Sequence, residues 1–283
     1  MNENPYIDIH SHLNFSVFEE DRDEVILRAQ RENVYMINVG TQLDTSKSAI
    51  ELAEKYEKGV FACVGVHPIH SDVSHHDEQE LGEGNREFTS RGEKVDEEVY
   101  RKLASHKKVV AIGECGLDYY RNDPKTYKKQ VDNFLAQIRV ANSINKPLML
   151  HVRKSVDSGV RSAYLDVADI IKSEAKTKFN FHFFAGTLDE AKVLLDMGAM
   201  FSFTGVITFA KEYKEIVLYI PNDRIFSETD SPYVAPIPYR GKRNESAYVI
   251  EVVNKMAEIK GISPDTMKDH IWNNAKNFFG IER

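Results

Sequence analysis

Short apolar runs alternate along the chain with longer stretches in which apolar residues recur at helical spacing. The apolar runs are rich in β-branched and aromatic residues and predict eight strands: Tyr6–Ile9, Tyr35–Val39, Val60–Val66, Val109–Ile112, Pro147–His151, Phe179–Phe183, Ala199–Phe203 and Ile225–Glu228. The stretches between them predict amphipathic helices, among them Asp23–Glu32, Thr45–Lys58, Tyr127–Asn142, Leu188–Met197, Ser246–Lys260 and Pro264–Phe279. Strands this apolar are buried on both faces, so we predict a single-domain (β/α)₈ TIM barrel.

Two segments interrupt the alternation. Residues 74–98 contain nine acidic and three basic residues and almost no aliphatic ones, so we predict a solvated acidic loop inserted after the third strand. The Pro-rich run Pro232–Pro238 follows the eighth strand and leads into Arg240, Lys242 and Arg243. We predict a shaped loop there.

Composition narrows the class of protein. The 283 residues are 42% hydrophobic and 29% charged, which suits a protein with a full core. The net charge is −7, from 37 basic and 44 acidic residues, and it excludes a wholly basic protein that coats nucleic acid, although not a local basic cleft.

Two sequence features bear on compartment. Cys63 and Cys115 both lie in apolar runs, which excludes a disulfide scaffold and favours a reducing compartment. No apolar run approaches about 18 residues, and the first residues lack the pattern of a signal peptide. We therefore expect a cytoplasmic protein, or a nuclear one in a eukaryote, without a membrane partner.

A pair of histidines marks the end of the first strand. His10 and His12 are two positions apart, so their side chains point to the same side of the strand. Two imidazoles in this arrangement can converge on one metal ion. The pair alone fits equally well with two polar residues at a barrel mouth.

Ligand-type residues occupy the same position in other strand–helix units. Because the carboxyl ends of all barrel strands share one face, these side chains can meet the two histidines at one point. They are Glu114, His151, His182 and Asp230. The six residues together predict a metal centre at the barrel mouth.

Several ordered motifs resemble a known family. They are the histidine pair, GVHP (Gly65–Pro68), IGECGLDYY (Ile112–Tyr120), HVR (His151–Arg153), FHFFAG (Phe181–Gly186), ETDSPY (Glu228–Tyr233) and RGKRNE (Arg240–Glu245). In this order they are similar to the TatD family of metal-dependent hydrolases within the amidohydrolase superfamily. The resemblance runs from about Tyr6 to Phe279.

The resemblance implies a TIM barrel with two divalent metal ions that hydrolyses DNA, often as a 3′–5′ exonuclease. By matched motif, His10, His12 and Asp230 would hold one ion, His151 and His182 the other, and Glu114 would bridge them. The family is described as Mg²⁺-dependent, whereas four histidines suit Mn²⁺ or Zn²⁺ better. We therefore expect Mg²⁺, Mn²⁺ or Zn²⁺.

Phosphodiester hydrolysis needs such a centre for electrostatic reasons. The ester's negative charge repels hydroxide, and two metal ions can lower the pKa of water, orient it and neutralise the leaving oxygen. We expect Asp230 to accept the proton of the attacking water, because a carboxylate beside a dication stays ionised. Together with Glu114, which would bridge the two ions, Asp230 is an expected catalytic residue.

Residues near the same strand ends are candidates for substrate binding. Arg153, Arg240 and Lys242 would form a local cationic rim suited to phosphate, or ordinary surface charge. Tyr119 would stack on unpaired bases or pack in the rim. His67 would contact the scissile phosphate or stabilise its turn. Asp118 would orient a ligand histidine or cap the next helix.

These residues leave three functions to compare. The first is a metal-dependent deoxyribonuclease acting on single-stranded DNA, without an obligate protein partner, because a barrel mouth admits one strand more readily than a duplex. The second is hydrolysis of an ester or amide, such as aminoacyl-tRNA, by the same activated water. The third is an adaptor that binds through the acidic insertion.

Overall fold

Eight parallel strands form the main sheet. The computed structural model describes residues 4–282 except 74, 77–87, 90, 121–123, 157, 158 and 160. The strands are β1 (Tyr6–Ser11), β2 (Val34–Val39), β3 (Val60–Val64), β6 (Val109–Asp118), β7 (Leu148–Arg153), β8 (Phe179–Phe181), β9 (Met200–Phe203) and β10 (Ile225–Ser227), hydrogen-bonded in this order. Each predicted strand overlaps one of them.

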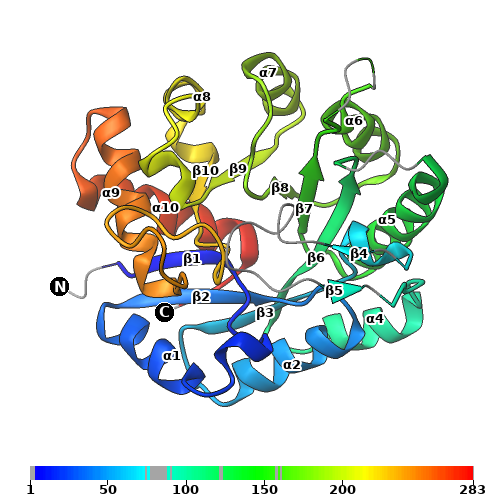
Figure 1. The fold of residues 1–283 in the computed structure, drawn as a ribbon, viewed down its shortest axis with the longest axis horizontal. Helices are drawn as coiled ribbons and strands as arrows, with labels where there is room; N and C mark the ends of the chain where they lie inside the picture. The colour runs from blue at the N-terminus through cyan, green and yellow to red at the C-terminus, as the bar shows by residue number, and fades with distance from the viewer. Residues whose placement is uncertain are drawn as a thin grey trace.

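The last strand returns to the first, so the sheet curls into a nearly closed barrel (Figure 1). Just beyond β10, the N–H of Asp230 donates to the carbonyl of His10 (2.8 Å), and the N–H of His12 donates to the carbonyl of Ser231 (2.8 Å). The hydroxyl of Ser227 reaches the carbonyl of Ile7 (2.8 Å). These contacts join the first and last strands beside the predicted site, and the predicted (β/α)₈ fold is confirmed.

Helices surround the strands on the outside (Figure 1). They are α1 (Arg22–Arg31), α2 (Leu43–Glu54), α4 (Glu97–Ala104), α5 (Pro124–Ile144), α6 (Ala163–Glu174), α7 (Leu188–Asp196), α8 (Tyr213–Tyr219), α9 (Val249–Lys260) and α10 (Pro264–Phe279). In the described part of the chain, none of these helices is both long and apolar enough to cross a bilayer.

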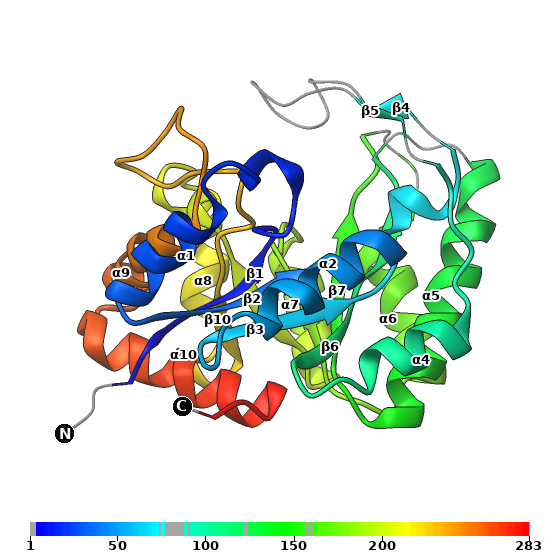
Figure 2. The ribbon, with the colours of Figure 1, turned by 90° about the horizontal axis from the view of Figure 1, so that it is seen from below.

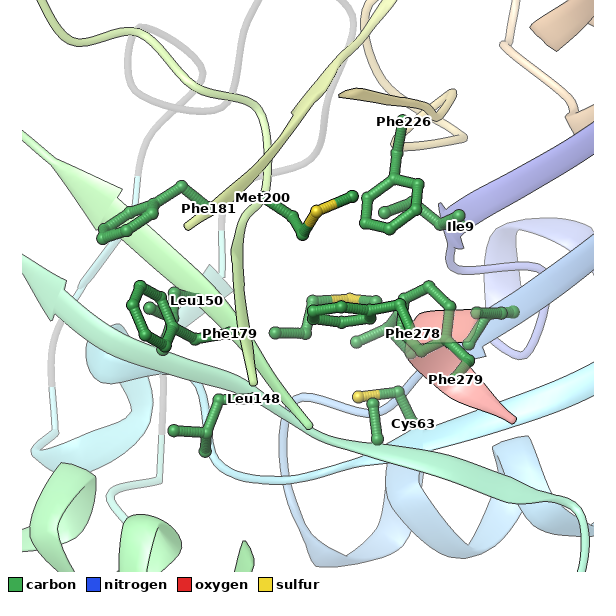
Figure 3. Close-up of a cluster of buried hydrophobic side chains, with 14 of the residues drawn as sticks. Ile9, Cys63, Leu148, Leu150, Phe179, Phe181, Met200, Phe226, Phe278 and Phe279 are labelled. Carbon is green, nitrogen blue, oxygen red and sulfur yellow. The ribbon is translucent and has the colours of Figure 1, made fainter. Parts of the chain in front are cut away.

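The final helix covers part of the barrel core. The hydroxyl of Ser263 accepts the N–H of Thr266 at its start, and Gly280 takes a left-handed conformation (φ 67°) at its end. Phe278 and Phe279 pack against Phe226 of β10, with ring centroids 5.3 and 5.6 Å away. Figure 3 shows these rings with apolar side chains from other strands, including the buried, unpaired Cys63.

The predicted acidic loop needs a correction at its carboxyl end. Residues 74, 77–87 and 90 lie outside the described residues, whereas 75–76 and 88–89 form a two-stranded antiparallel sheet, β4 and β5. The predicted boundary at residue 98 is wrong, because α4 begins at Glu97. The carboxylate of Asp96 caps this helix by accepting the N–H groups of Glu98 and Val99.

Candidate metal centre

All six predicted ligand residues meet at the carboxyl ends of the strands. Glu114 lies among the histidines: its Oε1 is 2.8 Å from Nδ1 of His151 and 2.9 Å from Nε2 of His182. Its Oε2 is 3.4 Å from Nε2 of His10. The Glu114 side chain is only 4% exposed, so its carboxylate is held by these rings rather than by water.

Asp230 and His12 complete one side of the cluster. Oδ1 of Asp230 lies 3.4 Å from Nε2 of His12 and 3.7 Å from Nε2 of His10. The two histidine nitrogens are 3.2 Å apart. Glu114 therefore lies between His10, His12 and Asp230 on one side and His151 on the other. His182 contacts both sides, because its ring stacks on that of His10 at 3.8 Å.

The backbone of β6 directs Glu114 into the barrel. The register between β6 and β7 shifts between Ile112 and Cys115, as in a β-bulge. Gly116 passes so close to β7 that a Cβ atom there would overlap the carbonyl oxygen of His151. β6 therefore continues to Asp118 rather than ending at Ile112, the predicted boundary. The absence of a side chain at Gly116 permits this close strand pairing.

The residue before Asp230 is fixed by the buried carboxylate of Asp8. Asp8 accepts the N–H of Thr229 (2.8 Å) and its hydroxyl (2.6 Å), and Asp8 is fully buried. Burial raises the pKa of Asp8 to about 7, against the effect of these hydrogen bonds. The backbone of Asp230 is left-handed (φ 54°), a conformation that Asp tolerates better than most residues.

Two histidines have a hydrogen-bonding partner behind the ring, and a third has a carboxylate there. Nδ1 of His12 lies 2.9 Å from the carbonyl of Val39, and Nε2 of His151 lies 3.0 Å from Oδ2 of Asp118. Nδ1 of His182 lies 3.3 Å from Oε1 of Glu228. A proton on each of these nitrogens leaves the other nitrogen's lone pair facing Glu114, which is the arrangement that a metal ligand needs.

Glu228 is a site residue that the sequence analysis did not single out. It is fully buried and accepts the hydroxyl of Ser202 (2.7 Å) and the N–H of Phe183 (2.6 Å). It thereby ties the chain segment after β8 to β9 and β10. Its position two residues before Asp230, in the same motif, was the available signal. Asp118, by contrast, was predicted to orient a ligand histidine or to cap the next helix. It contacts His151 and accepts the N–H of Tyr120 (2.9 Å), and α5 begins only at Pro124.

Replacing Glu228 with Gln is expected to weaken metal binding by about 10- to 100-fold. The amide keeps the size of the side chain but loses the charge that favours a proton on Nδ1 of His182. Calorimetric titration of EDTA-treated protein with Mn²⁺ measures the effect without any substrate. Glu245→Gln is the matched control, because this buried carboxylate pairs with Arg28 (2.6 Å) instead. Equal affinity in both variants would rule out a positioning role for Glu228.

The cluster carries more negative than permanent positive charge. Among the described residues, no Lys or Arg forms an ion pair with Glu114 or Asp230. Burial opposes ionisation of Glu114, yet His67, His182 and His10 hold the pKa of its carboxyl well below the ordinary value. Burial likewise disfavours a charged His182, but Glu114 and Glu228 raise the pKa of its ring well above the ordinary value. The carboxylates therefore draw protons onto histidines where no other cation is present.

Divalent cations fit this donor set. Imidazole nitrogens and carboxylate oxygens are common ligands of Zn²⁺, Mn²⁺ and Fe²⁺. Ligand atoms within 4.8 Å of one another come from three overlapping groups of residues: His10, His182 and Asp230; His10, His12 and Glu114; and His67, Glu114 and His151. The unpartnered Nδ1 of His10 is fully buried, so its Nε2 is the nitrogen that faces the cluster.

His67 joins the cluster in a role of its own. Nε2 of His67 is 3.3 Å from Oε1 of Glu114, and its Nδ1 accepts the N–H of Ile69 (3.1 Å). Burial and neighbouring His151 lower the pKa of His67 to about 4, so the ring is neutral. Because Nδ1 is an acceptor, the single proton lies on Nε2, and His67 is a hydrogen-bond donor into the site. Its Nδ1 contact stabilises the turn, as one of the two expectations for His67 has it, and contact with the scissile phosphate stays a prediction.

Two of the predicted substrate-binding residues, Tyr119 and Arg153, lie at the ends of β6 and β7. Tyr119 does not enter the site: it is 5% exposed, stacks on Tyr127 and donates its hydroxyl to Asp166 (3.1 Å). Its expected base-stacking role is therefore corrected to packing. Arg153 ends β7 near the cluster, and its guanidinium stacks on Tyr120 at 3.7 Å.

Arg240 and Lys242 lie farther along the loop after β10. Both side chains are exposed, and no contact joins either of them to the six clustered residues. Arg121, which follows the fourth predicted strand, lies outside the described residues.

Comparison with known proteins gives one consistent result. A family model described as TatD related DNase matches residues 7–280. The metal-dependent hydrolase YabD of Bacillus subtilis is 36% identical over 280 residues, which are 97% of this chain and 98% of that protein. A Pantoea ananatis protein named 3′-5′ ssDNA/RNA exonuclease TatD is 30% identical and covers 97% of this chain and 99% of its own. The crystal structure of YjjV, a TatD homologue from Escherichia coli, matches with a TM-score of 0.79 at 23% identity over 98% of both chains.

Proposed function

Because the chain belongs to the family of TatD related DNases, which are metal-dependent hydrolases, we propose that it hydrolyses phosphodiester bonds at the 3′ end of single-stranded DNA. The observation that carries the proposal is the buried Glu114 carboxylate, surrounded by histidine nitrogens and adjacent to Asp230 at the barrel mouth. The name of the Pantoea relative supports the 3′–5′ direction and a single-stranded substrate.

Six residues would hold the metal ions. His10, His12 and Asp230 would hold one ion, His151 and His182 would hold a second, and Glu114, which lies between these residues, would be shared by both. Bound divalent ions would supply Lewis-acid stabilisation of the charge that develops on the phosphate oxygens. The buried rings and their partners Asp118 and Glu228 keep the ligand atoms in place before substrate arrives.

The remaining groups orient substrate and move the proton. The Asp230 carboxylate is the proton acceptor for the attacking water. His12, His10 and His182 lower its pKa against the effect of burial, so the carboxylate is ionised and free to accept a proton. Nε2–H of His67 donates to a non-bridging phosphate oxygen. Arg153, held against Tyr120, offers its guanidinium to the same phosphate or the next one.

Degradation of a 5′-labelled oligonucleotide tests this proposal. The purified full chain is incubated with labelled single-stranded DNA and with Mg²⁺, Mn²⁺, Zn²⁺ or EDTA. We expect a ladder that shortens from the 3′ end with at least one metal and no products with EDTA. Release of amino acid from aminoacyl-tRNA without DNA cleavage, under the same conditions, would instead support ester hydrolysis.

Arg153→Ala is expected to raise KM for the oligonucleotide about tenfold and to change kcat much less, since a charge-assisted hydrogen bond to phosphate forms in the ground state as well. Arg161→Ala is the control, because this exposed arginine pairs with Asp166 and Asp169 on α6. An unchanged KM in Arg153→Ala would remove Arg153 from the substrate site.

A further inference from the structure

The loop after β10 leaves the metal centre and returns to it. It begins at Asp230, and fully buried Asn244 closes it by donating to the carbonyls of Thr229 (2.9 Å) and Tyr233 (2.6 Å). Figure 2 shows this loop, drawn in orange before α9, extending beyond the strands at the same end of the barrel as β4 and β5. Its tip therefore lies on the rim of the barrel mouth.

The loop is docked on the short 3₁₀ helix that follows β9. Gly205 begins that helix, and a Cβ atom there would come within 2.5 Å of the carbonyl oxygen of Val234. The hydroxyl of Thr208 accepts the N–H of Ile237 (3.0 Å). The close approach and this hydrogen bond give the loop a defined position on the rim.

An arginine and an aromatic ring form a flat surface on the docked loop. The guanidinium of Arg240 stacks on the ring of Phe209 at 4.1 Å and donates to the carbonyl of Ala235 (3.1 Å). Phe209 is 39% exposed although it is a large apolar residue. Beside this pair, the ring of Tyr239 stacks on Tyr248 at 3.7 Å. The Arg240–Phe209 pair is exposed and Tyr239 is half-buried. Planar groups that are fixed and accessible are suited to stacking with nucleobases.

No described residue neutralises the positive charge on this surface. Arg240 and Lys242 form no ion pair with any residue in the described ranges, and both are exposed. The nearby Arg243 pairs with Asp21, and across the mouth Lys154 pairs with Glu190. In a chain of net charge −7, two adjacent unpaired cations mark the place where an anion is favoured.

We propose that Phe209, Tyr239, Arg240 and Lys242 bind the nucleotides of a single strand that lie upstream of the bond being cleaved. This inference rests on the proposed function and adds a second contact region to it. Arg240 and Lys242 neutralise backbone phosphates, and a base stacks on the exposed plane of the Arg240–Phe209 pair.

Equilibrium binding of an oligonucleotide tests the proposal. The probe is fluorescein-labelled dT12 with phosphorothioate linkages, which keep the charge and resist hydrolysis, and fluorescence anisotropy measures its Kd for the metal-loaded full chain. We expect Arg240→Ala and Phe209→Ala each to weaken binding about tenfold. Arg240→Ala should also reduce the slope of log K against log salt by about 0.7, whereas Phe209→Ala should leave that slope unchanged.

Two controls separate this surface from general surface effects. Arg224→Ala removes a partly exposed arginine at the opposite end of β10, and Leu218→Ala removes an exposed apolar side chain from α8. Both should bind dT12 like the wild type. Unchanged affinity in both Arg240→Ala and Phe209→Ala, or no binding of dT12 by the wild type, would overturn the proposal.

The two proposals fail in distinguishable ways. Cleavage of ordinary DNA with unchanged dT12 affinity in the variants would reject the binding surface and keep the nuclease. Loss of dT12 binding in both variants, in a protein that cleaves no DNA with any metal, would keep the surface and reject the nuclease.

Discussion

Glu114→Gln is expected to lower kcat for phosphodiester hydrolysis by at least about 10³-fold. The amide has the same shape, but it loses the negative charge that lies within 2.8–3.4 Å of nitrogens from His151, His182 and His10. A neutral side chain in that place can no longer bridge two cations. Steady-state hydrolysis of single-stranded DNA with saturating Mn²⁺ measures the loss.

The fold should survive this substitution. Without the Glu114 charge, the neighbouring histidines can become neutral, so no buried charge is left uncompensated. Circular dichroism and thermal unfolding of the metal-free proteins should therefore give nearly equal Tm values. Full activity in a folded Glu114→Gln protein would contradict the central position of this residue.

Asp230→Asn is expected to lower kcat by about 10²- to 10⁴-fold, the range typical of a lost general base. Asn cannot accept the proton of water, but it tolerates the left-handed backbone of residue 230 (φ 54°), so the loop should keep its conformation. Metal affinity should fall less than in Glu114→Gln, because the other ligands stay in place. Parallel measurement of kcat and Mn²⁺ affinity separates the two effects.

Asp223→Asn is the matched control for this substitution. Asp223 is exposed and precedes the same strand at its other end, so its replacement should leave both kcat and metal affinity unchanged. If Asp230→Asn also retained the wild-type kcat, another group would have to accept the proton.

The sequence was sufficient for the barrel and for the meeting of six polar side chains. Strand ends in a parallel barrel share one face, so His10, His151 and Asp230 could be placed together from their positions after apolar runs. Those runs are buried on both faces in the structure, as their composition indicates. This inference depends on topology alone, and no side-chain detail is needed for it.

The contacts of individual side chains could not be predicted where they depend on the local geometry of the backbone. Tyr119 packs on Tyr127, whereas Tyr120 lies against Arg153, and sequence spacing does not record this difference. For Glu228, its position two residues before Asp230 was a signal, but its contact with His182 could not be predicted, because His182 comes from another strand.

The acidic residues at the start of α4 show that a run of negative charge is found both in loops and at the beginning of helices. Asp96, Glu97 and Glu98 extend an acidic segment and were therefore predicted to be part of a solvated loop. In the structure they cap the helix and occupy its first turn, where negative charge is favoured by the helix dipole. The same residues are typical of both settings, and only the helix that follows distinguishes them.

The central claim is that the clustered residues bind two divalent ions through Glu114. Its most direct test is the stoichiometry of Mn²⁺ bound to EDTA-treated, folded protein, measured by calorimetric titration and by elemental analysis of the complex. We predict two ions per wild-type chain and fewer in Glu114→Gln. A folded wild-type chain that binds no ion, or a Glu114→Gln chain that binds as many ions as tightly as the wild type, would contradict the account.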